Sequence, residues 1–155
     1  MRIEIVKGSM PYLDDCEQAL QKSALGEKYF AAPGSAEKAV REGLRSQDMF
    51  MALADGQCAG FFYYIPKGAF HGFPYLHIIA VKEEYRGKGI GAALLDRFES
   101  IAFEKADKVF LVVADFNPDA KRFYEKHGYR QAGEIPGLYR PGITEYLMMK
   151  GKKDE

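Results

Sequence analysis

The segment Val81–Ala92, with the sequence V-K-E-E-Y-R-G-K-G-I-G-A, limits most strongly what this chain can fold into. The apolar, β-branched run at 75–81 leads into it and predicts a strand. The residues that follow, 93–102, repeat their apolar side chains with helical spacing. A glycine loop between a strand and a helix start gathers backbone N–H groups and the positive end of the helix dipole. The segment therefore predicts a cradle for an anion, most naturally a phosphate.

Three glycines alternate with two cationic residues in this segment. The five residues are Arg86, Gly87, Lys88, Gly89 and Gly91. A nucleotide P-loop is excluded because its Gly-Lys pair must be followed by Ser or Thr, whereas Gly89 follows Lys88. A tight turn that binds nothing would leave the two cations unexplained. We therefore expect the loop to hold an anionic ligand.

A dinucleotide-binding unit is another alternative for the same loop. Gly87, Gly89 and Ala92 fit the pattern G-x-G-x-x-A. That fold also needs an acidic residue about 20 residues further on, at the end of the next strand. The nearby residues 111–113 are Leu, Val and Val, which disfavours a nicotinamide-binding oxidoreductase.

The composition is typical of one globular domain in a reducing compartment. The chain of 155 residues has 22 basic and 22 acidic side chains, so no charge excess indicates a nucleic-acid partner. Cys16 and Cys58 are expected as buried thiols, with a disulfide disfavoured. No apolar run is long enough for a membrane span, and the charged N-terminus is unlike a signal peptide. We expect a cytoplasmic protein with one domain over 1–150 and a disordered tail over 151–155.

Alternating apolar residues and turn signals predict about seven strands. The expected ranges are 2–7, 48–54, 57–65, 74–82, 108–115, 129–134 and 143–150. Between the second and third of these, Asp55-Gly56 is a strong signal for a type I′ hairpin turn. The apolar centre of 108–115 predicts a strand in the middle of the sheet.

Helices are expected after Ser9, after Ser35, after the glycine loop and after Asn117. The segments 26–34 and 66–73 are expected to be irregular. This order of elements implies an α/β (α+β) fold with a single mixed, mostly antiparallel sheet and helices on both of its faces.

A second motif lies at Asn117–Tyr129, with the sequence N-P-D-A-K-R-F-Y-E-K-H-G-Y. Asn117 before a proline is a good helix start, and Gly128 is typical of a helix end. Asn117 and Tyr124 are seven residues apart in the sequence, nearly two helical turns, and so share a helix face. Taken alone, Asn117 is explained as an N-cap and Tyr124 as a buried aromatic residue.

Together the two motifs resemble those of the GCN5-related N-acetyltransferase (GNAT) superfamily. Arg86-x-x-Gly89-x-Gly91, directly after a strand, is similar to its acyl-CoA pyrophosphate loop. The pattern N-x6-Y-x3-G-[FY] is similar to the segment that follows its fifth strand. The resemblance covers roughly residues 48–134, and the first two helices match only in outline.

The resemblance implies the GNAT fold and acetyl-CoA as cosubstrate. Asn117 would contact the pantetheine arm, and Tyr124 would act as general acid toward the departing coenzyme A thiolate. The cofactor-binding residues that it implies are Ile79, Ala80, Val81, Arg86, Gly87, Lys88, Gly89, Ile90, Gly91, Ala92, Asn117 and Tyr124.

The general base is the least complete part of the resemblance. Many superfamily members carry a glutamate on the fourth or fifth strand, and Val112 stands at the fifth-strand position here. Tyr75-Leu-His77 resembles the His-Leu-His of arylalkylamine N-acetyltransferases, which makes His77 a candidate base acting through water. A histidine packed within the sheet explains His77 equally well. No His, Cys or Asp cluster has metal-ligand spacing.

The resemblance implies an acetyl-CoA-dependent N-acetyltransferase whose primary-amine acceptor attacks the thioester directly. The missing glutamate favours the alternative, a non-catalytic acyl-CoA-binding or regulatory module on the same fold. The acceptor, a small molecule or a peptide, is expected between the Gly26–Gly34 segment and the Ile135–Gly142 loop. Glu27 and Glu145 could attract a cationic amine, although a solvated surface role suits each better. A monomer and a homodimer both fit the sequence.

Overall fold

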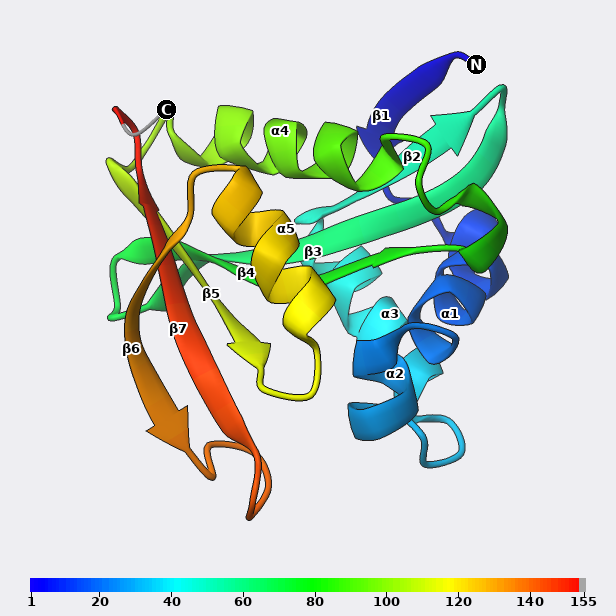
Figure 1. Ribbon diagram of the computed structural model, residues 1–155. Coiled ribbons are helices and arrows are strands. Elements are labelled where there is room, and N and C mark those ends of the chain that lie inside the picture. Colours follow the sequence, from blue (N-terminus) through cyan, green and yellow to red (C-terminus); the bar gives the residue numbers. More distant parts are fainter. Residues whose placement is uncertain (154–155) are drawn as a thin grey trace. The chain divides into compact units, whose positions relative to one another are not determined.

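The computed structural model describes residues 1–153, which divide into two compact units (Figure 1). The first unit comprises Met1–Ile65 and Leu76–Ile101, and the second comprises Pro66–Tyr75 and the chain from Ala102 onward. Strands β3 and β4 contribute residues to both units. Each unit has its own secondary structure and is described by itself below.

The first unit contains the N-terminal strands and four helices. The strands are β1 (Ile3–Lys7), β2 (Met49–Ala54), β3 (Gln57–Ala69) and β4 (Phe73–Val81). The helices are α1 (Leu13–Gln21), α2 (Ala24–Tyr29), α3 (Ser35–Ser46) and α4 (Ile90–Ala102), with 3-10 turns η1 (Met10–Tyr12) and η2 (Glu83–Tyr85). Strand β2 pairs antiparallel with both β1 and β3. Within this unit α4 lies on one side of the strands and α1–α3 on the other (Figure 1).

Small and apolar side chains join α1 and α3 to the strands. The buried residues of this cluster are Leu13, Cys16, Ala19, Leu20, Ala36, Ala39, Val40, Met49, Met51, Cys58, Phe61, Tyr63, Ile78 and Ala80. Alanine and cysteine on the helices let the backbones approach the sheet closely, and apolar burial is the main stabilising term. On the opposite side, Phe98 of α4 packs edge-on against Phe62 and Tyr64, with ring centroids 5.9 and 5.6 Å away.

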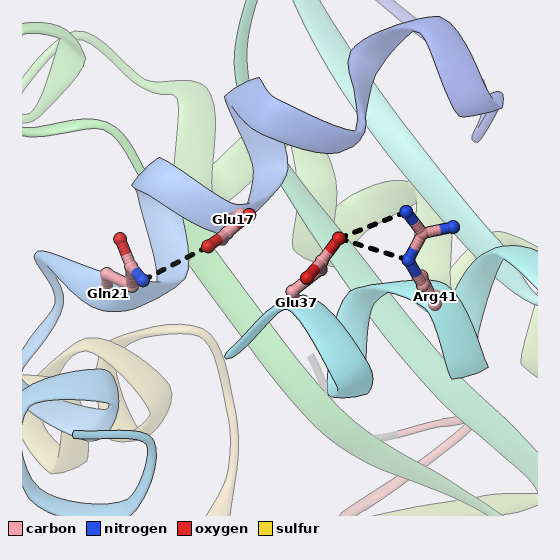
Figure 2. Close-up of polar contacts among 4 residues, drawn as sticks. All are labelled: Glu17, Gln21, Glu37 and Arg41. Carbon is pink, nitrogen blue, oxygen red and sulfur yellow. Dashed lines mark hydrogen bonds and ion pairs between the residues drawn. The ribbon is translucent and has the colours of Figure 1, made fainter. Parts of the chain in front are cut away.

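Polar pairs along the same two helices contribute little to the stability of the fold. Figure 2 shows Gln21 donating to Glu17 along α1 and Arg41 donating twice to Glu37 along α3. Each pair joins residues four apart, and such exposed pairs contribute about 0.3–0.5 kcal/mol. The amphipathic faces, and not these bridges, hold the helices on the strands.

The second unit is built around a central antiparallel strand. It contains β5 (Lys108–Ala114), α5 (Pro118–Lys126), β6 (Arg130–Pro136) and β7 (Thr144–Gly151). Strand β7 pairs antiparallel with β5 along one edge and with β6 along the other. Strand β5 pairs in parallel with β4, with Tyr75 opposite Phe110.

The seven strands form one mixed sheet in the order β1-β2-β3-β4-β5-β7-β6. The predicted fold class is therefore confirmed, with β4 and β5 as a parallel pair among antiparallel neighbours. The predicted turn at Asp55-Gly56 is also present, because both residues have the positive φ angles, 49° and 83°, that a type I′ turn requires.

Two segments expected to be irregular carry regular structure. Within 26–34, residues up to Tyr29 belong to α2, which Ser23 caps by accepting a hydrogen bond from the N–H of Gly26 at 3.0 Å. Within 66–73, β3 continues to Ala69, so that only residues 70–72 form the turn into β4. Proline and glycine in β3 suggested a loop, but the residues from Ile65 to Gly68 are solvent-exposed, where proline is tolerated in a strand.

Two helix and strand ends also differ from the expectation. Gly34 is the N-cap of α3, and the hydroxyl of Ser35 donates to the carbonyl of Ala32 at 2.8 Å. Strand β7 includes Gly151, the first residue of the predicted tail, and residues 154–155 of that tail lie outside the described part. The single domain over 1–150 stays a prediction.

The close approach of β3 to β4 at Gly60 leads to a first prediction. A Cβ atom at this position would lie 2.5 Å from the carbonyl oxygen of Ala80, which is backbone and cannot turn away. Gly60→Ala should therefore lower the free energy of unfolding by about 1–3 kcal/mol, the usual cost of overpacking. Urea denaturation measures this change.

Gly133→Ala is the matched control because a Cβ atom there meets nothing within 4 Å. Its free energy of unfolding should stay within about 0.5 kcal/mol of that of the native protein. Equal stability of the two variants would contradict the backbone contact at Gly60.

Candidate functional site

The glycine loop has the backbone that the sequence predicted. Gly87 and Gly89 have positive φ angles of 74° and 84°, which L-residues rarely adopt. Helix α4 starts at Ile90, and the N–H of Ala93 donates to the carbonyl of Gly89 at 3.1 Å. A Cβ atom at either glycine would meet nothing within 4 Å, so the space beside the loop is open. Phosphate binding by the loop stays a prediction.

Two cations in this segment, Lys82 and Arg86, connect it to α1. The Nζ of Lys82 lies 2.6 Å from Oδ1 of Asp15, and the side chains are only 11% and 39% exposed. Burial disfavours the charged form of Lys82, but the hydrogen bond and charge of Asp15 outweigh it and raise its pKa. Arg86 donates from Nη2 to the carbonyl of Lys22 at 2.9 Å and from Nε to that of Val81 at 3.3 Å. The guanidinium therefore satisfies one carbonyl at the end of α1 and one at the end of β4, and so braces the loop.

The sequence had assigned both cations within the loop to the ligand. In the structure Arg86 is engaged with backbone carbonyls, whereas Lys88 is exposed with its Nζ 5.9 Å from the centre of the Tyr85 ring. Lys82, which the sequence did not single out, is the half-buried cation at the start of the segment. Its partner Asp15 lies 67 residues earlier, a distance that no local pattern spans.

The end of β4 is held by β3. Along β4 the buried residues alternate with half-buried ones, and Ala80 is buried while its neighbours Ile79 and Val81 are half-buried. The N–H of Lys82 donates to the carbonyl of Ala59 at 2.7 Å, directly beside the close approach at Gly60. The three backbone units expected to serve the thioester thus sit at a strand end that backbone contacts hold against β3.

His77 is half-buried on β4 and packs against an aromatic ring. Its imidazole meets the ring of Tyr63 edge-on, with centroids 5.4 Å apart. Burial lowers the pKa of His77, and the charge of Glu42 opposes that shift only partly. The imidazole is therefore neutral at neutral pH, which suits both a base and a packed sheet histidine.

In the second unit, α5 places the two residues of the second motif. The side chain of Asn117 accepts a hydrogen bond from the N–H of Ala120 at 3.3 Å, so the predicted N-cap is confirmed. Tyr124 is 7% exposed and contacts the rings of Phe123 and Tyr129, with centroids 5.4 and 5.7 Å away. Burial raises the pKa of Tyr124, which keeps its hydroxyl protonated and able to donate.

One acidic residue departs from its expected surroundings. Glu145 is 2% exposed, although the sequence favoured a solvated role; Glu27 is exposed as expected. Glu145 lies near the start of β7, where it is paired with Ala114 of β5 on one side and Ile135 of β6 on the other. Of the residues of β7, only Glu145 and Met148 are buried.

Comparison with known proteins identifies the family of this chain. A family model described as "Acetyltransferase (GNAT) family" matches residues 14–129. The chain belongs to this family. The predicted membership of the GNAT superfamily is thus confirmed.

One relative with a similar sequence and two solved structures with a similar fold illustrate these matches. An uncharacterized N-acetyltransferase of Methanocaldococcus jannaschii is 37% identical over 105 residues, which cover 66% of this chain and 65% of the relative. Ard1 from Thermoplasma volcanium has a similar structure, with a TM-score of 0.81, 23% identity and coverage of 97% and 98% of the two chains. PaiA N-acetyltransferase from Thermoplasma acidophilum, solved with coenzyme A, gives a TM-score of 0.73 at 24% identity and covers 97% of this chain and 99% of that one.

The chain spans less than two thirds of the length of the curated relatives that it matches, with shares between 39% and 66%. The family and the named N-acetyltransferases support the prediction that this GNAT member is an acyltransferase. Within residues 1–153, no helix has the length and apolar content needed to cross a membrane.

The environment of His77 leads to a second prediction. Because its folded pKa lies below the ordinary value of 6.5, the unfolded chain binds more protons in the window between the two values. The free energy of unfolding should therefore fall as the pH drops below about 6.5, by at most about 1.4 kcal/mol per pH unit for this group. His77→Gln should lose less stability than the native protein between pH 7.5 and pH 5.

Urea midpoints at these two pH values measure the difference. His71→Gln, which changes an exposed histidine, is the control and should retain the native loss. A loss in His77→Gln as large as that of the native protein would contradict a buried, neutral imidazole.

Proposed function

We propose that this chain transfers an acetyl group from acetyl-CoA to a primary amine, by direct attack of the amine on the thioester. The observation that carries the proposal is the glycine loop of a GNAT family member, with two left-handed glycines before the 13-residue helix α4. Such a loop offers backbone N–H groups and the helix dipole to a pyrophosphate. Its donors are backbone N–H groups, so it would bind an anion through its shape and its positive potential.

The residues at this loop would hold the cosubstrate. Gly87, Gly89 and Gly91 would present N–H groups to the pyrophosphate, with Lys88 as the exposed cation beside them. The backbone of Ile79–Val81 would hydrogen-bond the pantetheine arm and polarise the thioester carbonyl, which develops negative charge during attack. Arg86 would keep the loop in place through α1.

Three chemical tasks remain for side chains. An alkylammonium has a pKa of about 10.4, so a proton must leave the amine before it can attack. We assign this step to His77 acting through water, because burial keeps its imidazole neutral. We assign protonation of the leaving thiolate to Tyr124, because burial keeps its phenol protonated. Asn117 would contact the pantetheine arm in addition to capping α5.

Val112 favours one competing function. It occupies the fifth-strand position where many superfamily members carry a glutamate, and so supplies no base. A non-catalytic acyl-CoA-binding or regulatory module would need none. Tyr124 and His77 favour catalysis, and the free, buried thiols of Cys16 and Cys58 favour a reducing compartment such as the cytoplasm.

Release of coenzyme A thiol from acetyl-CoA, measured against a broad panel of amines, tests the proposal. Turnover with at least one alkylamine, peptide N-terminus or lysine side chain supports an N-acetyltransferase and identifies the acceptor class. Tight binding of acetyl-CoA without turnover on any amine would favour the non-catalytic module.

A third prediction concerns the cosubstrate loop. Gly89→Val places a branched side chain where a backbone N–H group should face the pyrophosphate, and strains a backbone with φ of 84°. We expect the loss of acetyl-CoA binding by calorimetry while the circular dichroism spectrum is retained.

Gly56→Val is the matched control, because Gly56 has a φ of 83° and equally open surroundings but lies in the β2–β3 turn. It should bind acetyl-CoA as the native protein does. Native-like binding by Gly89→Val, or binding of NAD or ATP in place of acetyl-CoA, would contradict the assignment of the loop.

A fourth prediction concerns Tyr124. Tyr124→Phe keeps the buried ring but removes the hydroxyl that we assign to the leaving thiolate. General acid catalysis contributes about 10²–10⁴-fold in rate, so kcat should fall within that range while acetyl-CoA affinity and Tm change little.

Tyr129→Phe removes a hydroxyl from the neighbouring buried tyrosine, which is 3% exposed, and should leave kcat unchanged. The comparison requires conditions in which chemistry limits the rate. Equal kcat for Tyr124→Phe and the native protein would return Tyr124 to a packing role.

A further inference from the structure

Lys82 directly follows β4, and its two backbone groups and its side chain are all engaged. Its N–H donates to the carbonyl of Ala59 on β3 at 2.7 Å, and its carbonyl accepts from the N–H of Tyr85 in η2 at 2.9 Å. Its ammonium nitrogen lies 2.6 Å from Oδ1 of Asp15 on α1. All four residues belong to the first unit. Lys82 therefore joins β3, α1 and the 3-10 turn that precedes the glycine loop.

The ion pair between Lys82 and Asp15 is shielded from water, most strongly on the lysine side. The side chain of Lys82 is 11% exposed and that of Asp15 is 39% exposed. Two adjoining residues, Cys16 on α1 and Ala59 on β3, are fully buried. Salt and water screen a partly buried pair less than a pair at the surface. The carboxylate of Asp15 therefore holds the ammonium group in one position.

The glycines that follow have no comparable support. A Cβ atom at Gly87 or Gly89 would meet nothing within 4 Å, so the side of the loop that a side chain would occupy is open. Glycine also has more conformational freedom than any other residue. The direction in which the N–H groups of the loop point therefore depends on the contacts that precede it, at Lys82 and Arg86.

We propose that Asp15 is a positioning residue for the cosubstrate, because through Lys82 it fixes the glycine loop in the conformation that binds the pyrophosphate of acetyl-CoA. This inference rests on the proposed acetyl transfer and adds a residue of α1 to the determinants of cosubstrate affinity. A loop that is already ordered loses less entropy on binding than one that must first become ordered. Loss of the ion pair therefore weakens the binding of the pyrophosphate.

A purely electrostatic role for Asp15 predicts the opposite change in affinity. A carboxylate near an anion-binding loop repels the pyrophosphate, so removing its charge should strengthen the binding of acetyl-CoA. Release of the Lys82 ammonium group toward the ligand would strengthen binding as well. A carboxylate that positions the loop weakens binding when its charge is removed. The sign of the change in Kd therefore separates these roles.

Calorimetry of acetyl-CoA binding to Asp15→Asn measures this sign. The substitution keeps the size of the side chain and removes its charge. The Kd should rise about 10- to 100-fold, because misplacing binding groups by about 1 Å costs up to about 100-fold. An unchanged or lower Kd would overturn the inference.

Asp14→Asn is the matched control. Asp14 lies beside Asp15 in the first turn of α1, is exposed, and loses the same charge when it is changed to asparagine. Its variant shares any effect of net charge or of the helix dipole, and its Kd for acetyl-CoA should not rise. A rise in Asp14→Asn equal to that in Asp15→Asn would overturn the inference.

A second measurement separates positioning of the loop from a general loss of structure. S-Acetylpantetheine carries the thioester but lacks the pyrophosphate, so the loop contributes nothing to its use. With the amine that the native protein acetylates fastest, Asp15→Asn should lower kcat/KM for acetyl-CoA and leave kcat/KM for S-acetylpantetheine unchanged. An equal loss with both acetyl donors would overturn the inference.

The double variant Asp15→Asn, Lys82→Gln serves if the single variant does not fold. Removing one partner leaves the other charge half-buried and uncompensated, which is strongly destabilising, whereas removing both leaves no such charge. The double variant should still bind acetyl-CoA about 10- to 100-fold more weakly than the native protein does. Native affinity in the double variant would overturn the inference.

Failure of this inference and failure of the proposed function give different results. A native protein that binds acetyl-CoA but releases no thiol with any amine overturns the acetyl transfer, and the Kd of Asp15→Asn still decides the role of Asp15. A native protein that binds no acetyl-CoA overturns both. An active native protein whose variants keep the native Kd overturns only the positioning role.

Discussion

The close contact between the backbones of β3 and β4 at Gly60 is the constraint on which the predicted cosubstrate site depends. No side chain fits between Gly60 and the carbonyl of Ala80, and the next hydrogen bond joins Lys82 to Ala59. The 3-10 turn η2, the glycine loop and the start of α4 follow directly after this contact in the chain. A strand end that is fixed by backbone contacts gives the glycine loop a defined starting position.

The loop is fixed a second time by charge. Lys82 pairs with Asp15 and Arg86 binds the carbonyl of Lys22, so both cations connect the segment to α1. The exposed pairs along α1 and α3 stabilise only single helices, whereas these two contacts join residues more than 60 positions apart. These contacts matter because they fix the position of the loop. An anion-binding loop works only if its N–H groups already point toward the ligand before it binds.

The parts of the fold that were predicted correctly depend on local chemistry. Asp55-Gly56 is enough to predict a hairpin turn, and Asn117-Pro118 is enough to predict a helix start. The glycines of the loop are typical of the left-handed backbone angles that they adopt. The errors came where distant neighbours decide. The segment up to Tyr29 is helical because Ser23 caps it, and β3 passes through Pro66 because that stretch is exposed. Glu145 is buried on β7, and no short pattern around it carries that information.

Burial also determines the protonation states that the proposed chemistry needs. It lowers the pKa of His77 and raises those of Tyr75 and Tyr124, so one ring is neutral and the two phenols stay protonated. A base must be unprotonated and a donor protonated at the same pH, and desolvation achieves both because it disfavours every charged form.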